Sequence, residues 1–179
     1  MKRKLSVILL IICTVTIISA QDIVTPNRPV SMLSGDPGFI TINELHFGIG
    51  LGMTNVPYSK SFFGFTTING YQINKNFVVA GGTGLSFYNG GMLVPLFLDF
   101  RFRFNVSQFT PYIFGDGGFL LKLSNINSTK LFINPGLGIR YSFTRNWAAN
   151  LGGGFLIQTG TAGIRDTFIN IKAGVTYKF

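Results

Sequence analysis

Residues 93–106 read LVPLFLDFRFRFNV, and this stretch decides the fold class. Every second residue is large and apolar, whereas the positions between them include Asp99, Arg101 and Arg103. Because the side chains of a β-strand point alternately to opposite faces, the pattern predicts a strand with one wholly apolar face and one face that carries charge. The helical period of about 3.6 residues does not fit this stretch.

The same alternation continues along most of the chain. It predicts eight strands, at about 40–53, 61–73, 77–88, 93–106, 111–123, 131–143, 147–157 and 169–179. Strands of this length match a tilted membrane crossing. The face opposite the apolar one holds mainly glycine with single charges of both signs, whereas a soluble sandwich carries many polar side chains there. The predicted fold is therefore an all-β, eight-stranded antiparallel up-and-down transmembrane β-barrel, with glycines that leave room for inward neighbours such as Phe97 and Arg101.

The first 20 residues predict a secretory signal peptide. A basic start precedes an apolar run (5–18) and two small residues, which is the order of a cleavable signal, and the run is short for a membrane span. Residues 21–38 are rich in Pro, Ser, Gly and Asp and lack apolar periodicity, so they predict a flexible periplasmic leader. The domain organisation is a signal peptide at 1–20, a leader at 21–38 and an outer-membrane barrel at 39–179.

Composition and charge argue against a soluble enzyme and against nucleic-acid binding. Charged residues make up 12% of the chain, which contains 23 Gly and 19 Phe, and the mean hydropathy is +0.38. The formal charge is +9, with 15 basic and 6 acidic residues; loss of Lys2, Arg3 and Lys4 with the signal peptide leaves 12 basic residues and a charge of +6. The remaining basic residues are scattered among apolar strands, so we expect no nucleic-acid partner.

Aromatic residues recur at the strand ends. Three of them open strands directly after a turn, at a spacing of 35 residues, and three more stand at the complementary strand ends. Both sets fall at one rim, and membrane barrels carry aromatic girdles at their interfaces. An even strand number places both chain ends on the same side, which for such barrels is the periplasm. The pattern therefore predicts a periplasmic aromatic girdle formed by Phe77, Phe104, Tyr112, Phe143, Trp147 and Phe179.

With its signal peptide, eight alternating strands and terminal strand INIKAGVTYKF, the sequence resembles the small outer-membrane barrels of the OmpA and OmpX type over residues 40–179. In that family the terminal strand ends in aromatic-x-Phe and is read by the barrel-assembly machinery. The resemblance implies that Tyr177 and Phe179 form the assembly signal and that this machinery is a partner during biogenesis. It also implies a place in the outer membrane of a Gram-negative bacterium, with both termini periplasmic, in contact with membrane lipid and lipopolysaccharide.

The sequence departs from that family in two ways. The segments opposite the chain ends are short, and no peptidoglycan-binding domain follows the barrel. We therefore expect neither surface adhesion nor wall anchoring.

Seven charged residues point into the lumen by the parity of their positions: Glu44, Asp99, Arg101, Arg103, Asp116, Arg140 and Lys172. Charges enclosed in a barrel must pair, because an unpaired buried charge has a large desolvation cost. We interpret them as an ion-pair network that fills the core. The alternatives are an ion or proton path and a binding site for a small polar ligand. Side chains just fill the interior of an eight-stranded barrel, so no wide pore is expected.

The sequence lacks the combinations of residues that catalytic and metal sites usually need. His46 is the only histidine, and Cys13, the only cysteine, lies within the predicted signal peptide. A zinc site or a catalytic triad needs partners that the processed chain lacks. In the family's lipid A deacylases and acyltransferases, Ser and His sit together near the outer rim, whereas His46 lies early in the first strand. We expect no enzyme activity, no metal and no cofactor.

Three function hypotheses follow from these patterns. The leading one is a structural or interaction barrel that contacts lipid, lipopolysaccharide or an unidentified protein. The alternative is a narrow channel or small-ligand carrier that uses the charged lumen. A secreted soluble ligand-binding barrel is the third hypothesis, and membrane fractionation separates it from the other two.

Overall fold

The computed structural model describes residues 36–51, 60–89, 91–105, 107–122, 129–159 and 165–179. The predicted signal peptide and all but the last three residues of the predicted leader lie outside these ranges, as do large parts of the connecting segments opposite the chain ends. The described residues form eight strands: β1 (Gly38–Gly50), β2 (Ser61–Gln72), β3 (Phe77–Tyr88), β4 (Gly91–Arg103), β5 (Phe109–Lys122), β6 (Lys130–Ser142), β7 (Trp147–Thr159) and β8 (Arg165–Lys178). Among these residues no helix is long and apolar enough to cross a membrane.

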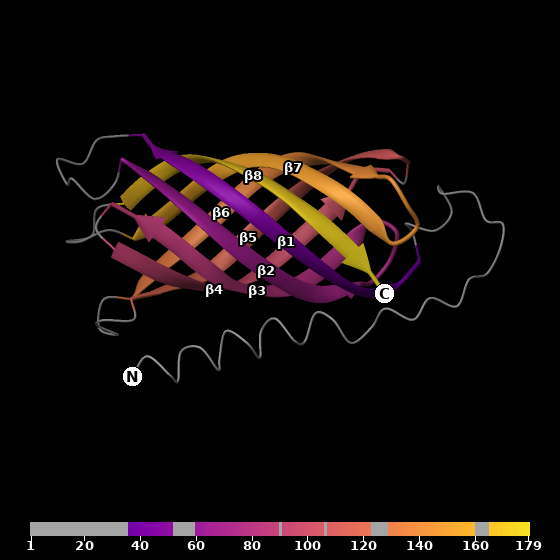
Figure 1. Ribbon diagram of the computed structural model, residues 1–179, viewed down its shortest axis with the longest axis horizontal. Coiled ribbons are helices and arrows are strands. Elements are labelled where there is room, and N and C mark those ends of the chain that lie inside the picture. The colour runs from indigo at the N-terminus through magenta and orange to yellow at the C-terminus, as the bar shows by residue number, and fades with distance from the viewer. Residues whose placement is uncertain (1–35, 52–59, 90, 106, 123–128, 160–164) are drawn as a thin grey trace.

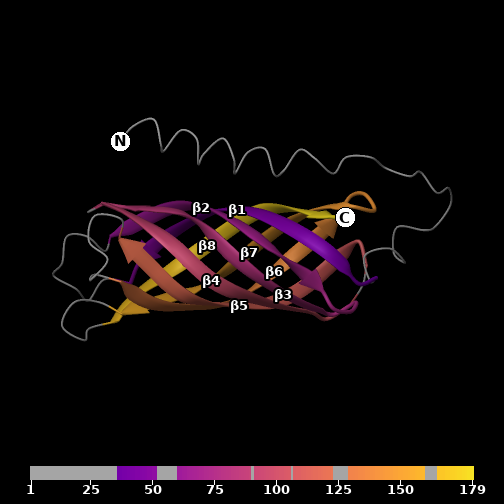
Figure 2. The same cartoon turned by 90° about the horizontal axis from the view of Figure 1, so that it is seen from below.

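The eight strands close into a barrel (Figures 1 and 2). Each strand pairs with its neighbours in chain order, every pair is antiparallel, and β1 pairs with β8 to complete the sheet. Because the sheet is closed, every strand is hydrogen-bonded to a neighbour on both sides, and no strand edge is left unpaired. The prediction of an eight-stranded antiparallel up-and-down barrel is confirmed.

The start of β1 and the end of β8 lie at the same end of the barrel, where the backbone N–H of Phe179 donates to the carbonyl of Phe39 at 3.0 Å. We call this end the terminal rim, and the opposite end the distal rim; the letter C marks the terminal rim in Figure 1.

The turn between β2 and β3 is also at the terminal rim. Asn74 Oδ1 accepts hydrogen bonds from the backbone N–H groups of Asn76 and Phe77, both at 2.9 Å, which is how asparagine stabilises tight turns.

Strand bounds differ from the prediction mainly at the ends. β8 begins at Arg165 rather than near 169, because Arg165 pairs with Thr159 of β7. β5 begins at Phe109 rather than 111, because Phe109 pairs with Tyr141 of β6. The apolar alternation fades at both places, so the extra residues are in strand conformation through cross-strand pairing and not through a pattern of their own.

The barrel is arranged with charge inside and apolar residues outside. On β6 the outward Leu137 is 70% exposed, whereas the inward Arg140 is 5% exposed. The same alternation separates Leu98, 57% exposed, from Asp99, 0% exposed, on β4. The faces predicted from the sequence for β4, β6 and β8 are confirmed.

Candidate functional site

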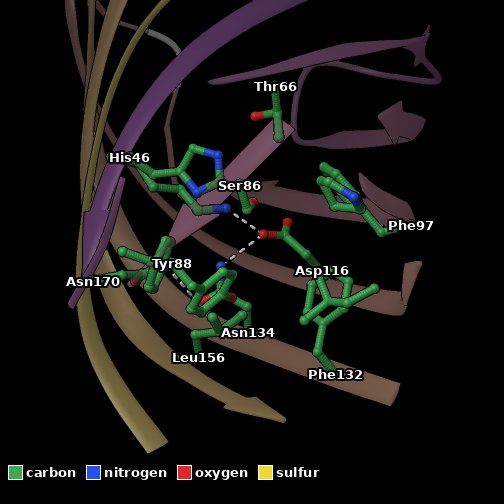
Figure 3. Close-up of a pocket in the computed structure, with 14 residues that line it drawn as sticks. His46, Thr66, Ser86, Tyr88, Phe97, Asp116, Phe132, Asn134, Leu156 and Asn170 are labelled. Atoms are coloured by element: carbon green, nitrogen blue, oxygen red, sulfur yellow. Dashed lines mark hydrogen bonds and ion pairs between the residues drawn. The ribbon is translucent and has the colours of Figure 1, made fainter. Parts of the chain in front are cut away.

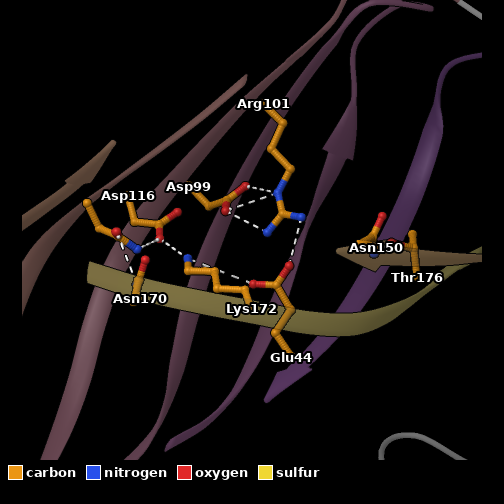
Figure 4. Close-up of polar contacts among 9 residues, drawn as sticks. Glu44, Asp99, Arg101, Asp116, Asn150, Asn170, Lys172 and Thr176 are labelled. Atoms are coloured by element: carbon orange, nitrogen blue, oxygen red, sulfur yellow. Dashed lines mark hydrogen bonds and ion pairs between the residues drawn. The ribbon is translucent and has the colours of Figure 1, made fainter. Parts of the chain in front are cut away.

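A cluster of buried charges lies in the middle of the lumen (Figure 4). Arg101 is at its centre. One guanidinium nitrogen, Nη1, lies 2.9 Å from Glu44 Oε1, while Nε and Nη2 both donate to the carboxylate of Asp99 at 2.9 Å. The planar guanidinium thus bonds two carboxylates at once, one of them through two parallel hydrogen bonds, which is the geometry that arginine provides and lysine cannot.

Lys172 extends the cluster to a third carboxylate. Its Nζ bonds Asp116 Oδ2 and lies 3.9 Å from Glu44 Oε2. The amide of Asn134 also donates to Asp116 Oδ2, at 2.8 Å, and Asn170 donates to the Asn134 side chain at 3.2 Å. β1, β4, β5, β6 and β8 all contribute to this chain of contacts, so the cluster ties together strands from all around the barrel (Figure 4).

Two aromatic rings line the cations of this cluster. The Lys172 ammonium lies 4.5 Å from the centre of the Phe114 ring, and the Arg101 guanidinium lies 5.6 Å from the centre of the Tyr112 ring. Both separations are within the range of a cation–π attraction. Counted as ionised groups, the cluster holds three carboxylates and two cations. Removal of either cation therefore leaves two more negative charges than positive ones.

Of the seven charged residues predicted to share one network, the structure joins five: Glu44, Asp99, Arg101, Asp116 and Lys172. Arg103 also faces inward but lies at the terminal rim, where its Nη1 donates to Gln72 Oε1 at 2.8 Å. Arg140 faces inward between Thr110 and Asn150 of the neighbouring strands. The parity of the positions correctly predicted that both side chains face inward, but it carried no information about how far along the barrel axis each one lies.

A layer of rings fills the lumen between the cluster and the distal rim. Phe62 and Tyr88 stack with their ring centres 5.2 Å apart, and Phe168 packs edge-on against Phe62 at 5.3 Å. Across the lumen, Phe97 and Phe132 pack at 5.9 Å. We call these five residues the aromatic plug. All but Tyr88 belong to the buried apolar core, and Tyr88 packs against that core.

Two glycines make room for the plug. A Cβ at Gly48 would overlap the ring of Phe62, and a Cβ at Gly82 would overlap the ring of Phe97. Both glycines are buried and face the lumen. This close approach agrees with the expectation that inward glycines accommodate large inward neighbours.

A small cavity separates the plug from the charges (Figure 3). Its volume is about 20 Å³, and its lining includes His46, Ser86, Asp116 and Asn170 on the polar side. A cavity of this size holds about one water molecule and is far too small for a metabolite. Across the residues that the structure describes, no group of three or more His, Cys, Asp or Glu side chains is arranged to hold a metal ion.

The predicted aromatic girdle needs one correction. Phe104, Phe143, Trp147 and Phe179 are outward and between 46% and 59% exposed, and Phe77 has the outward parity of β3. Tyr112, however, is 3% exposed and faces the lumen. The prediction for Tyr112 was wrong because residues four apart in a strand face the same side, so Tyr112 must share the inward face of Asp116.

Other aromatic residues complete the outward ring at the terminal rim. On β5 the position expected for Tyr112 is taken by Phe109, whose ring lies 4.7 Å from that of Tyr141. The rings of Phe39 and Tyr71 pair at 5.1 Å on β1 and β2. The alternation placed Asn134 and Asn170 on the inward face, but sequence reasoning gave their amide groups no role and did not identify most of the plug. Parity could have placed the plug residues inside the barrel, because each stands an even number of positions from an inward residue of its own strand.

Solved structures with a similar fold come from small membrane barrels. Neisserial surface protein A superposes with a TM-score of 0.53 at 17% identity, over 79% of this chain and 96% of that chain. The chain has the fold of a small transmembrane β-barrel. A de novo designed transmembrane β-barrel (TM-score 0.49, 17% identity, 80% and 98% coverage) and Ail, the attachment invasion locus protein of Yersinia pestis (0.48, 13%, 79% and 99%), are also similar.

These similarities extend to the fold and not to a family. No family model matches the sequence, and no curated protein matches it either. At 17% identity a shared transmembrane barrel fold says nothing about which residues act. The role of this transmembrane barrel must therefore be argued from its own wall and lumen.

Proposed function

We propose that this chain is an integral outer-membrane barrel of a Gram-negative bacterium, with a structural or interaction role, no catalytic activity and a lumen closed to diffusion. Both termini face the periplasm, and the wall contacts membrane lipid and lipopolysaccharide. Tyr177 and Phe179, at the end of β8, serve as the signal for the barrel-assembly machinery.

The single observation that carries this proposal is the apolar outer wall. Large apolar side chains are exposed on every strand, for example Leu45 (50%), Leu98 (57%), Leu151 (61%) and Ile171 (58%). Soluble proteins rarely expose continuous apolar areas of this kind, whereas a barrel in hydrocarbon needs them on its whole circumference. Aromatic rings flank this belt at the terminal rim, where Trp147 and Tyr177 pack at 4.9 Å, as expected at a membrane interface.

The filled lumen supports a structural or interaction role over a channel. A path along the barrel axis would have to pass the aromatic plug and then the ion pairs of Arg101. The cavity between them holds about one water molecule. The narrow channel or small-ligand carrier therefore remains the second candidate, favoured only by the charge in the lumen.

Cell fractionation of the expressed chain tests the membrane assignment. We expect the protein in the outer-membrane fraction, with different mobility in unboiled and boiled samples on a detergent gel, because a closed barrel resists unfolding by detergent alone. A reference periplasmic protein, processed in parallel, controls for cross-contamination of the fractions. Recovery in the soluble fraction without a mobility difference would favour the secreted soluble barrel and contradict this proposal.

Planar-bilayer recording tests whether the lumen is closed. We expect no steady conductance from the purified chain at protein levels at which a reference porin gives clear steps. The Asp116→Asn variant should behave in the same way, because the aromatic plug is unchanged in it. Steady, ion-selective openings whose selectivity changes in Asp116→Asn would instead support the channel.

A further inference from the structure

On the described strands, the outer wall of the barrel carries a polar area near the terminal rim. Five outward residues on β1, β2 and β3, together with one glycine, form what we call the wall patch: Thr41, Asn43, Thr67, Asn69, Gly81 and Thr83. They are adjacent in the sheet, since Thr41 pairs with Asn69, Asn43 with Thr67, Thr67 with Thr83 and Asn69 with Gly81. The three strands lie side by side in Figure 1.

The rest of the wall has a different composition. On the described strands β4, β5, β6 and β7, the outward positions between the strand ends hold apolar or aromatic residues, glycine or proline. The polar side chains of the wall patch are therefore not part of a general tolerance for polar residues. They gather three to six residues from the terminal-rim ends of their strands, at a depth where the wall is otherwise apolar.

Hydrogen bonds inside the wall patch use only part of its polar capacity. Thr41 Oγ1 donates to Asn69 Oδ1 at 2.7 Å, and Thr67 Oγ1 donates to Asn43 Oδ1 at 2.9 Å. These bonds occupy the carbonyl oxygens of both asparagines. The two Nδ2 groups, with two N–H donors each, make no hydrogen bond to any residue that the structure describes. Both asparagines face outward, and Asn69 is exposed.

Such donors are costly next to lipid tails, which offer no acceptor. Between membrane-embedded walls, in contrast, asparagine and threonine form hydrogen bonds, and small residues allow the backbones to approach closely. Gly81 and the short threonines would allow such a close approach of two backbones at the wall patch. We propose that the wall patch is the contact surface between two copies of this chain that lie side by side in the membrane.

The chemistry of the wall patch favours a second copy as the occupant. A two-fold axis along the membrane normal brings the same surface of both chains together, so that surface must complement itself. The wall patch meets this condition because amide donors and hydroxyl acceptors alternate within it: Asn43 lies opposite Thr67, and Asn69 lies opposite Thr41. It contains no charge, so two copies approach without repulsion.

Thiol cross-linking of the full chain in phospholipid vesicles tests the dimer. A Cys13→Ser background removes the only native thiol. In it, Thr83→Cys places a single thiol inside the wall patch without removing any of its hydrogen-bonding asparagines. The control is Leu137→Cys, because β6 lies across the barrel from β2 in the strand order and Leu137 is 70% exposed. With a short bismaleimide, we expect at least ten-fold more product of twice the chain mass from Thr83→Cys than from the control.

A second pair of variants tests whether the asparagines hold the contact. Adding Asn43→Val and Asn69→Val to Thr83→Cys should lower the cross-linked yield about ten-fold, to the level of the Leu137→Cys control. The matched pair Ile133→Val and Ile139→Val, on β6, should leave the yield unchanged. Equal yields from Thr83→Cys and Leu137→Cys, or a yield insensitive to the asparagine substitutions, would overturn the proposal.

The inference rests on the proposed function, because the cost of the free amides arises only if the wall faces lipid. Gel mobility of the unboiled samples separates the two failures. A normal mobility shift without cross-linking would refute the dimer and leave the membrane barrel standing. A third outcome is a cross-linked product of another mass that forms in native membranes but not with the purified chain. It would show that the wall patch contacts a different protein, and it would also refute the dimer.

Discussion

Arg101→Met is expected to lower the free energy of unfolding by about 3–5 kcal/mol, the usual cost of removing one partner from a buried ion pair. The substitution preserves much of the apolar volume but leaves Glu44 and Asp99, which are 1% and 0% exposed, without the guanidinium that bonds both of them. Lys172 cannot compensate for the loss, because it is then the single cation beside the three carboxylates of the cluster. Urea titration of the folded barrel in detergent micelles or vesicles measures the change.

Asp116→Asn is the matched control for this prediction. It removes a carboxylate from the same cluster, but it leaves Glu44 and Asp99 balanced by Arg101 and Lys172, and the new amide can still accept a hydrogen bond from Lys172. We expect a smaller loss of stability than for Arg101→Met. Equal losses for the two variants would mean that the charge balance of the cluster does not determine its contribution to stability.

The second large effect concerns the wall. Ile171→Arg should lower the free energy of unfolding in a bilayer by about 2–4 kcal/mol, because Ile171 is 58% exposed near the middle of β8 and a charge at that depth faces hydrocarbon. Unfolding of the variant and the parent chain in the same phospholipid vesicles measures the difference.

A graded series distinguishes membrane depth from loss of packing. Val175→Arg, closer to the terminal rim, should cost less than Ile171→Arg, and Thr159→Arg, at the distal end of β7, should cost about 0–1 kcal/mol. The same three substitutions should have similar effects if the wall faced water, so a flat series would contradict the membrane assignment.

The difference between the two sides of the wall explains what the sequence could predict. The two-residue period depends only on the local geometry of an extended chain, so LVPLFLDFRFRFNV was sufficient to assign Leu98 to the outside and Asp99 to the inside. The same rule, applied to Tyr112, would have placed it beside Asp116 in the lumen. The girdle prediction failed there because a spacing of 35 residues says nothing about which face a side chain occupies.

The heights of inward residues could not be read in the same way. Arg101 and Arg103 are two positions apart and share a face, yet Arg101 bonds Glu44 and Asp99 while Arg103 bonds Gln72 at the terminal rim. Which residues meet depends on how the ladders are staggered when the barrel closes. Closure brings β1 beside β8, which sets His46 against Lys172 across 126 residues of sequence.

The sequence by itself therefore determined the strands, their faces and the class of fold, because alternation is a local property of each strand. The tertiary structure decided the partners: the ion pairs of Arg101 and Lys172, the contacts of the aromatic plug, and the union of polar residues from three strands into the wall patch. These depend on register and closure, which join residues far apart in the chain and leave no periodic trace in the sequence.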